Sequence, residues 1–164
     1  MTRRPFLAAL SALGLAPRLA TAQSGPPKVE PGAPKIEPLR LSDVEWKQRL
    51  SPAAYEVLRH EGTEYPGSSP LNKEKRKGRY VCAGCELPLF SSDTKFESGT
   101  GWPSFWASLP GAVATQTDHK MFVPRVEYHC VRCGGHQGHV FDDGPPPTGK
   151  RYCNNGVALK FVPA

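Results

Sequence analysis

The chain has 164 residues, with 21 Lys or Arg against 15 Asp or Glu, so its formal net charge at pH 7 is +6. This length suits one domain, and 38% apolar residues with 16 Gly and 18 Pro favour strands and turns over a helical bundle. No run approaches the roughly 18–20 apolar residues of a membrane-spanning helix, so we expect no stable membrane insertion.

Residues 1–22 have the order of a secretory signal: an arginine pair, an apolar stretch and a small-residue A-x-A site at Ala20–Ala22. The pair Arg3 and Arg4 resembles a twin-arginine export signal, which predicts a periplasmic protein. A retained anchor or a mis-assigned start are the alternatives. Cleavage would remove Arg3, Arg4 and Arg18 and lower the formal charge from +6 to +3. We therefore expect no nucleic-acid partner.

Residues 23–40 repeat Pro and Gly with little apolar content, which predicts a disordered or extended linker. The remaining residues, 41–164, are predicted to form the folded domain.

Two short helices are expected at the start of this domain. Ser42 followed by Glu45 is a possible capping box for the first helix. Pro52, directly after a serine, begins the second helix, and Gly62 is placed to end it. Residues 61–77 are predicted to be a loop that ends in a mixed charge run.

From Gly78 onward, short strand-like pieces alternate with Gly, Pro, Ser and Asp. Residues 79–81 and 126–129 each lead from a strand into a CxxC turn. Two such turns supply four sulfurs, enough to bind Zn²⁺ tetrahedrally at about 2.3 Å. The predicted ligands of one zinc ion are Cys82, Cys85, Cys130 and Cys133.

Disulfides or redox-active pairs are the rival interpretations of these cysteines, since an exported protein can form disulfides. A disulfide inside each CxxC turn would be a strained small ring that braces the fold little. Iron is a further alternative to zinc. A closed four-cysteine zinc site has no open coordination position, so its predicted role is structural.

The fifth cysteine, Cys153, lies in a different setting. In a strand, Arg151, Cys153 and Asn155 would point to one face, because side chains alternate with period two. A nearby cation lowers the pKa of a thiol and raises its thiolate fraction. This face is a plausible active-site strip, although a lone cysteine is also common as an inert core residue.

Two other segments offer partners for that strip. His136 and His139 follow the second CxxC turn, and Trp102 lies in a glycine-rich aromatic loop at 98–106. Taken alone, the histidines could be core residues, support other groups or bind a second metal, and the tryptophan could be core.

Four motifs carry a family resemblance: CAGC with LPLF (82–90), TKFESGTGWPSF (94–105), the CxxC at 130–133, and HQGHVFDDGPPPTGKRYCNN (136–155). Together they resemble the methionine sulfoxide reductase B family, from about Leu41 to Val162. The resemblance implies reduction of the R epimer of methionine sulfoxide in peptides and proteins. It also implies a mainly β fold, with two antiparallel sheets in a compact domain, short N-terminal helices and a distal structural zinc site.

The resemblance also implies roles for individual residues. Cys153 matches the nucleophile and His139 the general acid, and Trp102 matches the indole that packs on the sulfoxide methyl group. The remaining implied site residues are His136, Arg151 and Asn155, which arrange these groups, Asp143, which orients one of them, and Phe105, which contacts substrate.

One departure concerns Thr100, which stands where many relatives have a resolving cysteine. We therefore expect a one-cysteine enzyme whose sulfenic acid is recycled by a thioredoxin-like reductant or a small thiol. Separately, we expect the protein to be a monomer. The alternatives are a non-catalytic zinc-binding interaction or chaperone-like module and a rubredoxin-like iron carrier. Both would leave Cys153 without a role.

Overall fold

The structure, a computed structural model, describes residues 36–120 and 123–164. The predicted signal at 1–22 and most of the predicted linker at 23–40 lie outside the described residues. Within the described ranges, no helix is both long and apolar enough to cross a bilayer.

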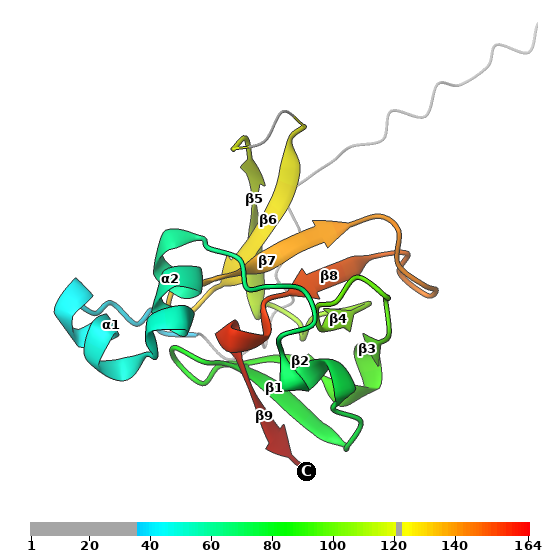
Figure 1. Cartoon of the computed structure of the whole chain (residues 1–164), viewed down its shortest axis with the longest axis horizontal. Coiled ribbons are helices and arrows are strands. Elements are labelled where there is room, and N and C mark those ends of the chain that lie inside the picture. Colours follow the sequence, from blue (N-terminus) through cyan, green and yellow to red (C-terminus); the bar gives the residue numbers. More distant parts are fainter. Residues whose placement is uncertain (1–35, 121–122) are drawn as a thin grey trace, which may run out of the picture. The chain divides into compact units, whose positions relative to one another are not determined.

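Two short α-helices precede a series of short strands (Figure 1). The helices are α1 (Asp43–Arg49) and α2 (Pro52–His60), and single 3₁₀ turns follow at Pro70–Lys73, Ser92–Thr94 and Gly156–Ala158 (η1, η2 and η3). The strands are β1 (Gly78–Cys82), β2 (Pro88–Ser91), β3 (Lys95–Phe96), β4 (Ser104–Phe105), β5 (Val113–Asp118), β6 (Arg125–Cys130), β7 (His136–Phe141), β8 (Arg151–Asn154) and β9 (Leu159–Pro163).

The strands form two antiparallel sheets, which confirms the predicted mainly β fold. One sheet has the order β2-β1-β9 and the other the order β3-β4-β8-β7-β6-β5. The C-terminal strand β9 thus pairs with β1, far from it in sequence, while β8 lies between β4 and β7 in the larger sheet. This order brings the segments around residues 102 and 153 side by side.

The helix boundaries follow the local sequence signals. Ser42 and Glu45 form the expected capping box at the start of α1, and Pro52 occupies the first turn of α2. The left-handed residue that ends α2 is Glu61 (φ 56°) rather than Gly62. Gly62 follows it, and its main-chain N–H donates to the carbonyl of Glu56. The loop predicted at 61–77 contains the 3₁₀ turn η1.

Aromatic side chains from both sheets pack between them. Tyr80 and Phe90 belong to the smaller sheet, and Phe105 and Tyr128 to the larger one, and all four are fully buried. Phe90 stacks on Phe105 with ring centroids 4.2 Å apart, and Tyr80 meets the same ring edge-on at 4.9 Å. Such rings bury much apolar area and hold offset or edge-to-face geometries. The core therefore lies at the interface of the sheets.

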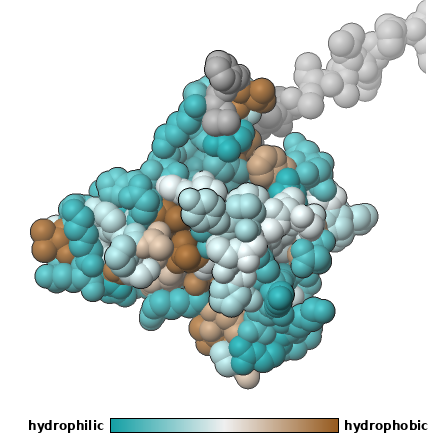
Figure 2. Space-filling view, viewed as in Figure 1, coloured by the Kyte–Doolittle hydropathy of each residue, from teal (hydrophilic) through white to brown (hydrophobic). Residues whose placement is uncertain are grey.

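The face of the molecule in Figure 2 is mostly hydrophilic, with several separate apolar areas rather than one continuous patch. The large apolar side chains exposed in the described ranges are correspondingly scattered: Val44, Tyr65, Val123, Val126 and Val162. Isolated exposed apolar residues are ordinary for a protein surface.

Candidate functional site

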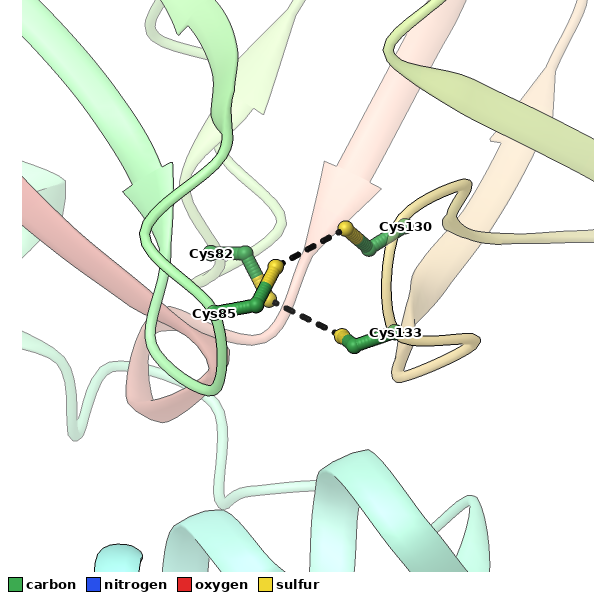
Figure 3. A group of neighbouring side chains, drawn as sticks. All are labelled: Cys82, Cys85, Cys130 and Cys133. Atoms are coloured by element: carbon green, nitrogen blue, oxygen red, sulfur yellow. Dashed lines mark hydrogen bonds between the residues drawn. The ribbon is translucent and has the colours of Figure 1, made fainter. Parts of the chain in front are cut away.

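The four cysteines predicted as metal ligands come together between the two sheets (Figure 3). Cys82 ends β1 and Cys130 ends β6, so each strand delivers one CxxC turn. The Sγ atoms lie within 4.8 Å of one another, at 3.7 Å for Cys82 with Cys133 and 3.4 Å for Cys85 with Cys130. A tetrahedron with metal–sulfur bonds of about 2.3 Å has edges of about 3.8 Å. The cluster therefore fits a zinc ion.

The surroundings of the cluster also suit bound thiolates. All four cysteines are buried, and the side-chain N–H of Gln137 donates to Cys82 Sγ at 3.4 Å. The thiols of Cys82 and Cys130 have a raised pKa, caused first by hydrogen bonding within the cluster and also by burial. Hydrogen bonding within the cluster lowers the pKa of Cys85 and Cys133. A bound cation would allow all four thiols to ionise together. All five cysteines of the chain lie in the described ranges, and none forms a disulfide in this structure.

Cys153 lies in a separate hollow of about 140 Å³, at β8. This volume is smaller than that of a typical cofactor site and suits the end of one side chain. The lining residues are Thr63, Trp102, Arg125, Gly138, His139, Phe141, Cys153, Asn154 and Asn155. The structure thus brings three of the predicted site residues, Trp102, His139 and Asn155, to the same hollow as Cys153.

Opposing effects act on the Cys153 thiol. Burial raises its pKa, whereas the charge of Arg151 and hydrogen bonds from Thr100 and Arg151 lower it. Burial is the larger effect, so the pKa lies above its ordinary value, although Arg151 lowers it in the predicted direction. Thr100 therefore lies beside the nucleophile candidate, at the place where a second thiol would meet it.

Arg151 is held by contacts on two sides. Its Nε and Nη2 donate to the two carboxylate oxygens of Asp143 at 2.8 and 2.9 Å, and its guanidinium lies 4.4 Å from the ring centroid of Phe141. A bidentate pair fixes the guanidinium plane. Asp143 therefore orients Arg151 rather than a histidine, and Arg151 is not among the residues that line the hollow.

His139 has partners that the sequence reading did not identify. Its Nε2 lies 2.8 Å from Asp118 Oδ2, and Arg125 Nη2 donates to the same carboxylate oxygen at 2.6 Å. Burial lowers the pKa of His139. The Lys120 main-chain N–H, with His139 and Arg125, holds the pKa of Asp118 well below its ordinary range. Asp118 is therefore a carboxylate placed to stabilise His139 when it is protonated.

His136 lies behind the hollow rather than in its wall. Its Nδ1 is 2.7 Å from Glu127 Oε1, and His129 Nδ1 is 3.1 Å from the other carboxylate oxygen. His136 is 3% and Glu127 2% exposed. The His136 ring meets the His139 ring edge-on at 5.5 Å. His136 can thus position His139, but it does not line the hollow where substrate would bind.

The indole of Trp102 is fixed by a loop that the sequence reading left without a role. Its Nε1–H donates to the main-chain carbonyl of Glu64 at 3.2 Å. The Glu64 carboxylate in turn accepts from the N–H groups of Gly156 and Val157 at 2.6 and 3.1 Å. Glu64 therefore ties the indole to the turn after β8, directly behind Cys153.

Both polar atoms of the Asn155 side chain form hydrogen bonds within the protein. Its Oδ1 accepts from the Glu64 N–H at 3.0 Å, and its Nδ2 donates to the Gln137 carbonyl at 3.1 Å. Its side chain therefore shapes the wall of the hollow instead of offering a free amide. Because β8 ends at Asn154, Asn155 lies just beyond the strand on which the common face was predicted.

Phe105 requires a correction. The predicted contact of its side chain with substrate is not possible in this structure, because the ring is fully buried and stacked on Phe90. It is absent from the lining of the hollow. Its contribution is indirect, through β4, in which Ser104 and Phe105 pair with Cys153 and Tyr152 of β8.

Comparison with known proteins identifies relatives over most of the chain. A model of the SelR domain family matches residues 50–163. "Peptide methionine sulfoxide reductase MsrB" of Methanosarcina barkeri is 56% identical over 121 residues, 73% of this chain and 85% of the relative. The protein of the same name from Agrobacterium fabrum is 48% identical over 132 residues, 80% of this chain and 96% of the relative. "Peptide methionine sulfoxide reductase B1, chloroplastic" of Arabidopsis thaliana is 49% identical over 130 residues, 79% and 64% of the two chains.

Proposed function

The chain belongs to the SelR-domain family and is a peptide methionine sulfoxide reductase of the MsrB type, and from that premise we propose that Cys153 is its nucleophile. The activity is reduction of the R epimer of methionine sulfoxide in peptides and proteins. The observation that carries the residue assignment is the hollow shared by Cys153, His139 and Trp102. A non-catalytic zinc module or an iron carrier would have no use for this hollow.

The first chemical step transfers the sulfoxide oxygen to the enzyme. The Cys153 sulfur donates an electron pair as the sulfur–oxygen bond of the substrate breaks, and the oxygen ends on Cys153 as a sulfenic acid. The substrate sulfur gains two electrons and the cysteine sulfur loses two. The oxygen needs a proton before it can leave, so the step needs an acid.

His139 is the proposed acid. It lines the hollow, and its Nε2 contacts the Asp118 carboxylate at 2.8 Å. Burial lowers the pKa of His139, so a neighbouring carboxylate is needed to stabilise the imidazolium form. The other ring nitrogen, Nδ1, then carries a proton for the departing oxygen. His136, Arg151, Asn155 and Asp143 are positioning residues in this proposal.

The proposed substrate wall is aromatic. Trp102 and Phe141 both line the hollow, and the Trp102 ring is held by its hydrogen bond to Glu64. An apolar wall accepts the methyl group of the sulfoxide, while His139 lies where the oxygen must point. Distinct places for these two groups, together with the side from which Cys153 approaches the sulfur, select one epimer.

Recycling needs a thiol from outside the chain. The four other cysteines form the buried cluster, and the position beside Cys153 carries Thr100. In the proposed cycle a first external thiol displaces water from the sulfenic acid and forms a mixed disulfide, and a second thiol releases Cys153 and an oxidised dithiol. A thioredoxin-like protein or a small thiol supplies the two electrons.

A zinc ion held by Cys82, Cys85, Cys130 and Cys133 would be structural. Four cysteine sulfur atoms would complete the coordination of such an ion and leave no position for substrate. The cluster also lies apart from the hollow, whose lining includes none of the four cysteines.

Export to the periplasm is a further part of the proposal. It rests on the sequence of residues 1–22 alone, with Arg3 and Arg4 before an apolar stretch and Ala20–Ala22 as the cleavage site. N-terminal sequencing of the protein recovered from the envelope fraction tests it. A mature protein that begins at Gln23 supports the proposal, and full-length protein in the cytosol contradicts it.

The activity test uses the separate R and S sulfoxides of a blocked methionine, with dithiothreitol as reductant. We expect the purified protein to consume only the R epimer, and the Cys153→Ser variant to consume neither. Thermal unfolding of both proteins shows that the variant is folded. Undiminished turnover by folded Cys153→Ser would show that another group is the nucleophile.

A further inference from the structure

A β-bulge gives Gln137 an unusual position in β7. Tyr128 of β6 pairs with Gly138 and His129 pairs with His136, so Gln137 is the extra residue without a partner in β6. A bulge bends a strand and redirects the side chain of the extra residue. The redirected side chain of Gln137 is fully buried, on a strand that runs from the second CxxC turn to the hollow.

The side chain of Gln137 reaches the cysteine cluster. Its Nε2 donates to Cys82 Sγ and to the main-chain carbonyl of Gly135, both at 3.4 Å. Both neighbours are acceptors, so the amide nitrogen must face them. Its Oε1 has no hydrogen-bond partner. A fully buried amide with one unpaired oxygen carries a desolvation penalty, which the hydrogen bond from its nitrogen to Cys82 Sγ offsets in part.

The main chain of Gln137 reaches the hollow. Its carbonyl accepts two hydrogen bonds from Asn155, from the main-chain N–H at 2.8 Å and from Nδ2 at 3.1 Å. Asn155 lines the hollow beside Cys153. One residue thus contacts a cluster sulfur through its side chain and the pocket wall through its carbonyl.

We propose that Gln137 is a positioning residue that couples the four-cysteine cluster to the substrate pocket. With a cation bound, Cys82 is a thiolate and a strong acceptor for the Gln137 amide. That hydrogen bond fixes residue 137, whose carbonyl then fixes Asn155. A change at the cluster therefore reaches the pocket wall through one side chain. This inference rests on the proposed role of the hollow around Cys153.

The first test replaces Gln137 by methionine, which has a similar volume but no N–H donor. Gln116→Met makes the same change on the exposed face of β5 and is the matched control. For Gln137→Met we expect about a 10-fold rise in the zinc dissociation constant by chelator competition. We also expect about a 5-fold fall in kcat/KM, equivalent to one hydrogen bond, carried mainly by KM because Cys153 and His139 are untouched.

The outcomes distinguish coupling between the cluster and the pocket from an effect of Gln137 on metal binding alone. Weaker zinc binding with unchanged kcat and KM would show that Gln137 serves the cluster only and would overturn the proposal. So would kinetics that change equally in Gln116→Met. Inactive wild-type protein would instead contradict the proposed function, whatever the zinc measurement gives.

A second test needs no variant and no turnover. Zinc is exchanged for ¹¹³Cd in the wild-type protein, and side-chain amide signals are followed by NMR. We expect a through-hydrogen-bond coupling between cadmium and the Gln137 amide, and a shift of the Asn155 side-chain signals between the two metal forms. The Asn72 side-chain amide, which donates to the Gly101 carbonyl, is the control and should stay in place. A Gln137 signal that responds while Asn155 does not would overturn the coupling.

Discussion

The reactivity of Cys153 depends on two opposing effects on one sulfur atom. Burial in the hollow disfavours the thiolate, while the Arg151 guanidinium favours it. Since burial is larger, the free enzyme holds a mostly protonated thiol at neutral pH, which protects it from unselective oxidation. Arg151 then limits how far the thiol pKa rises.

The first prediction concerns the charge of Arg151. In the wild-type protein, Cys153 alkylation by iodoacetamide should accelerate with pH until the pH exceeds the raised thiol pKa. Arg151→Met removes the cation, so the curve should move to higher pH and the rate at pH 8 should fall about 10-fold. Arg151→Lys keeps a charge and should lose less. Identical curves for the wild-type and methionine variants would show that the guanidinium does not act on the thiol.

The second prediction concerns Thr100, the residue beside the proposed nucleophile. Thr100→Cys places a thiol next to Cys153, so the sulfenic acid should collapse to an intramolecular disulfide with loss of water. Turnover with thioredoxin as reductant should rise at least about 10-fold, because the resolving step becomes intramolecular. Thr100→Ser keeps the hydroxyl without adding a thiol and should behave as wild type. Mass spectrometry of the oxidised proteins checks this, and a Cys153 disulfide within the wild-type chain would contradict the one-cysteine cycle.

Local sequence signals predicted some of this site and could not predict the rest. The CxxC turns and the caps of α1 and α2 are contacts between near neighbours, so their spacing suffices. Asp118 and Glu64 contact His139 and Gly156 across 21 and 92 positions of the chain. Such pairs exist only once β5, β7 and the turn after β8 are assembled. The sequence around a single acidic residue does not indicate which distant residue it will contact in the folded chain.

At the scale of the elements, the bulge in β7 is the decisive irregularity. In a regular strand, side chains three positions apart point to opposite faces. Yet the rings of His136 and His139 meet at 5.5 Å, because the extra residue Gln137 shifts the alternation by one. A strict period-two alternation does not predict this. The one local sign of an irregularity in HQGHVF is Gly138, because a glycine inside a strand often marks a bulge or a close backbone approach.

The third prediction concerns the buried carboxylate that β6 contributes. Burial raises the pKa of Glu127, but hydrogen bonds and charge from His129 and His136 outweigh it and lower the pKa to about 2. An unfolded glutamate titrates near 4.3, so Glu127 stabilises the fold above that pH. The stabilisation is lost as the pH falls through 4 toward about 2.

Glu127→Gln should therefore be less stable than wild type by about 2 kcal/mol at pH 6, and the difference should shrink toward pH 3. Urea unfolding across this pH range measures it, and comparison at each pH cancels any shared loss of metal. Glu56→Gln, on the exposed side of α2, should show a much smaller effect. A stability difference that stays constant with pH would show that Glu127 is not ionised in the folded protein.

At the scale of the whole described domain, two features connect the two sheets: the aromatic core and the cysteine cluster. The aromatic core packs β1 and β2 against β4 and β6, and the cysteine cluster links the end of β1 to the end of β6. The aromatic core holds the sheets together by burial of apolar surface, which does not depend on direction. A metal ion would instead bind four sulfur atoms in a defined geometry. The hollow with Cys153 lies on the larger sheet, in which β4 and β6 carry side chains of the aromatic core and β6 ends at Cys130 of the cluster.

The last prediction follows from this cross-link. Cys85 and Cys130 are 45 positions apart, and a link that closes such a loop removes about 4 kcal/mol of chain entropy from the unfolded state. Removing the metal with a thiol-reactive mercurial and a chelator should thus lower Tm by roughly 10–20 °C. Zinc release and Tm are measured on the same samples. Cys153→Ser is the matched control, because Cys153 lies outside the cluster: it should hold the same zinc and lose the same stability on stripping. If the metal were removed while Tm stayed constant, the metal would not stabilise the fold. The aromatic core alone would then hold the sheets together.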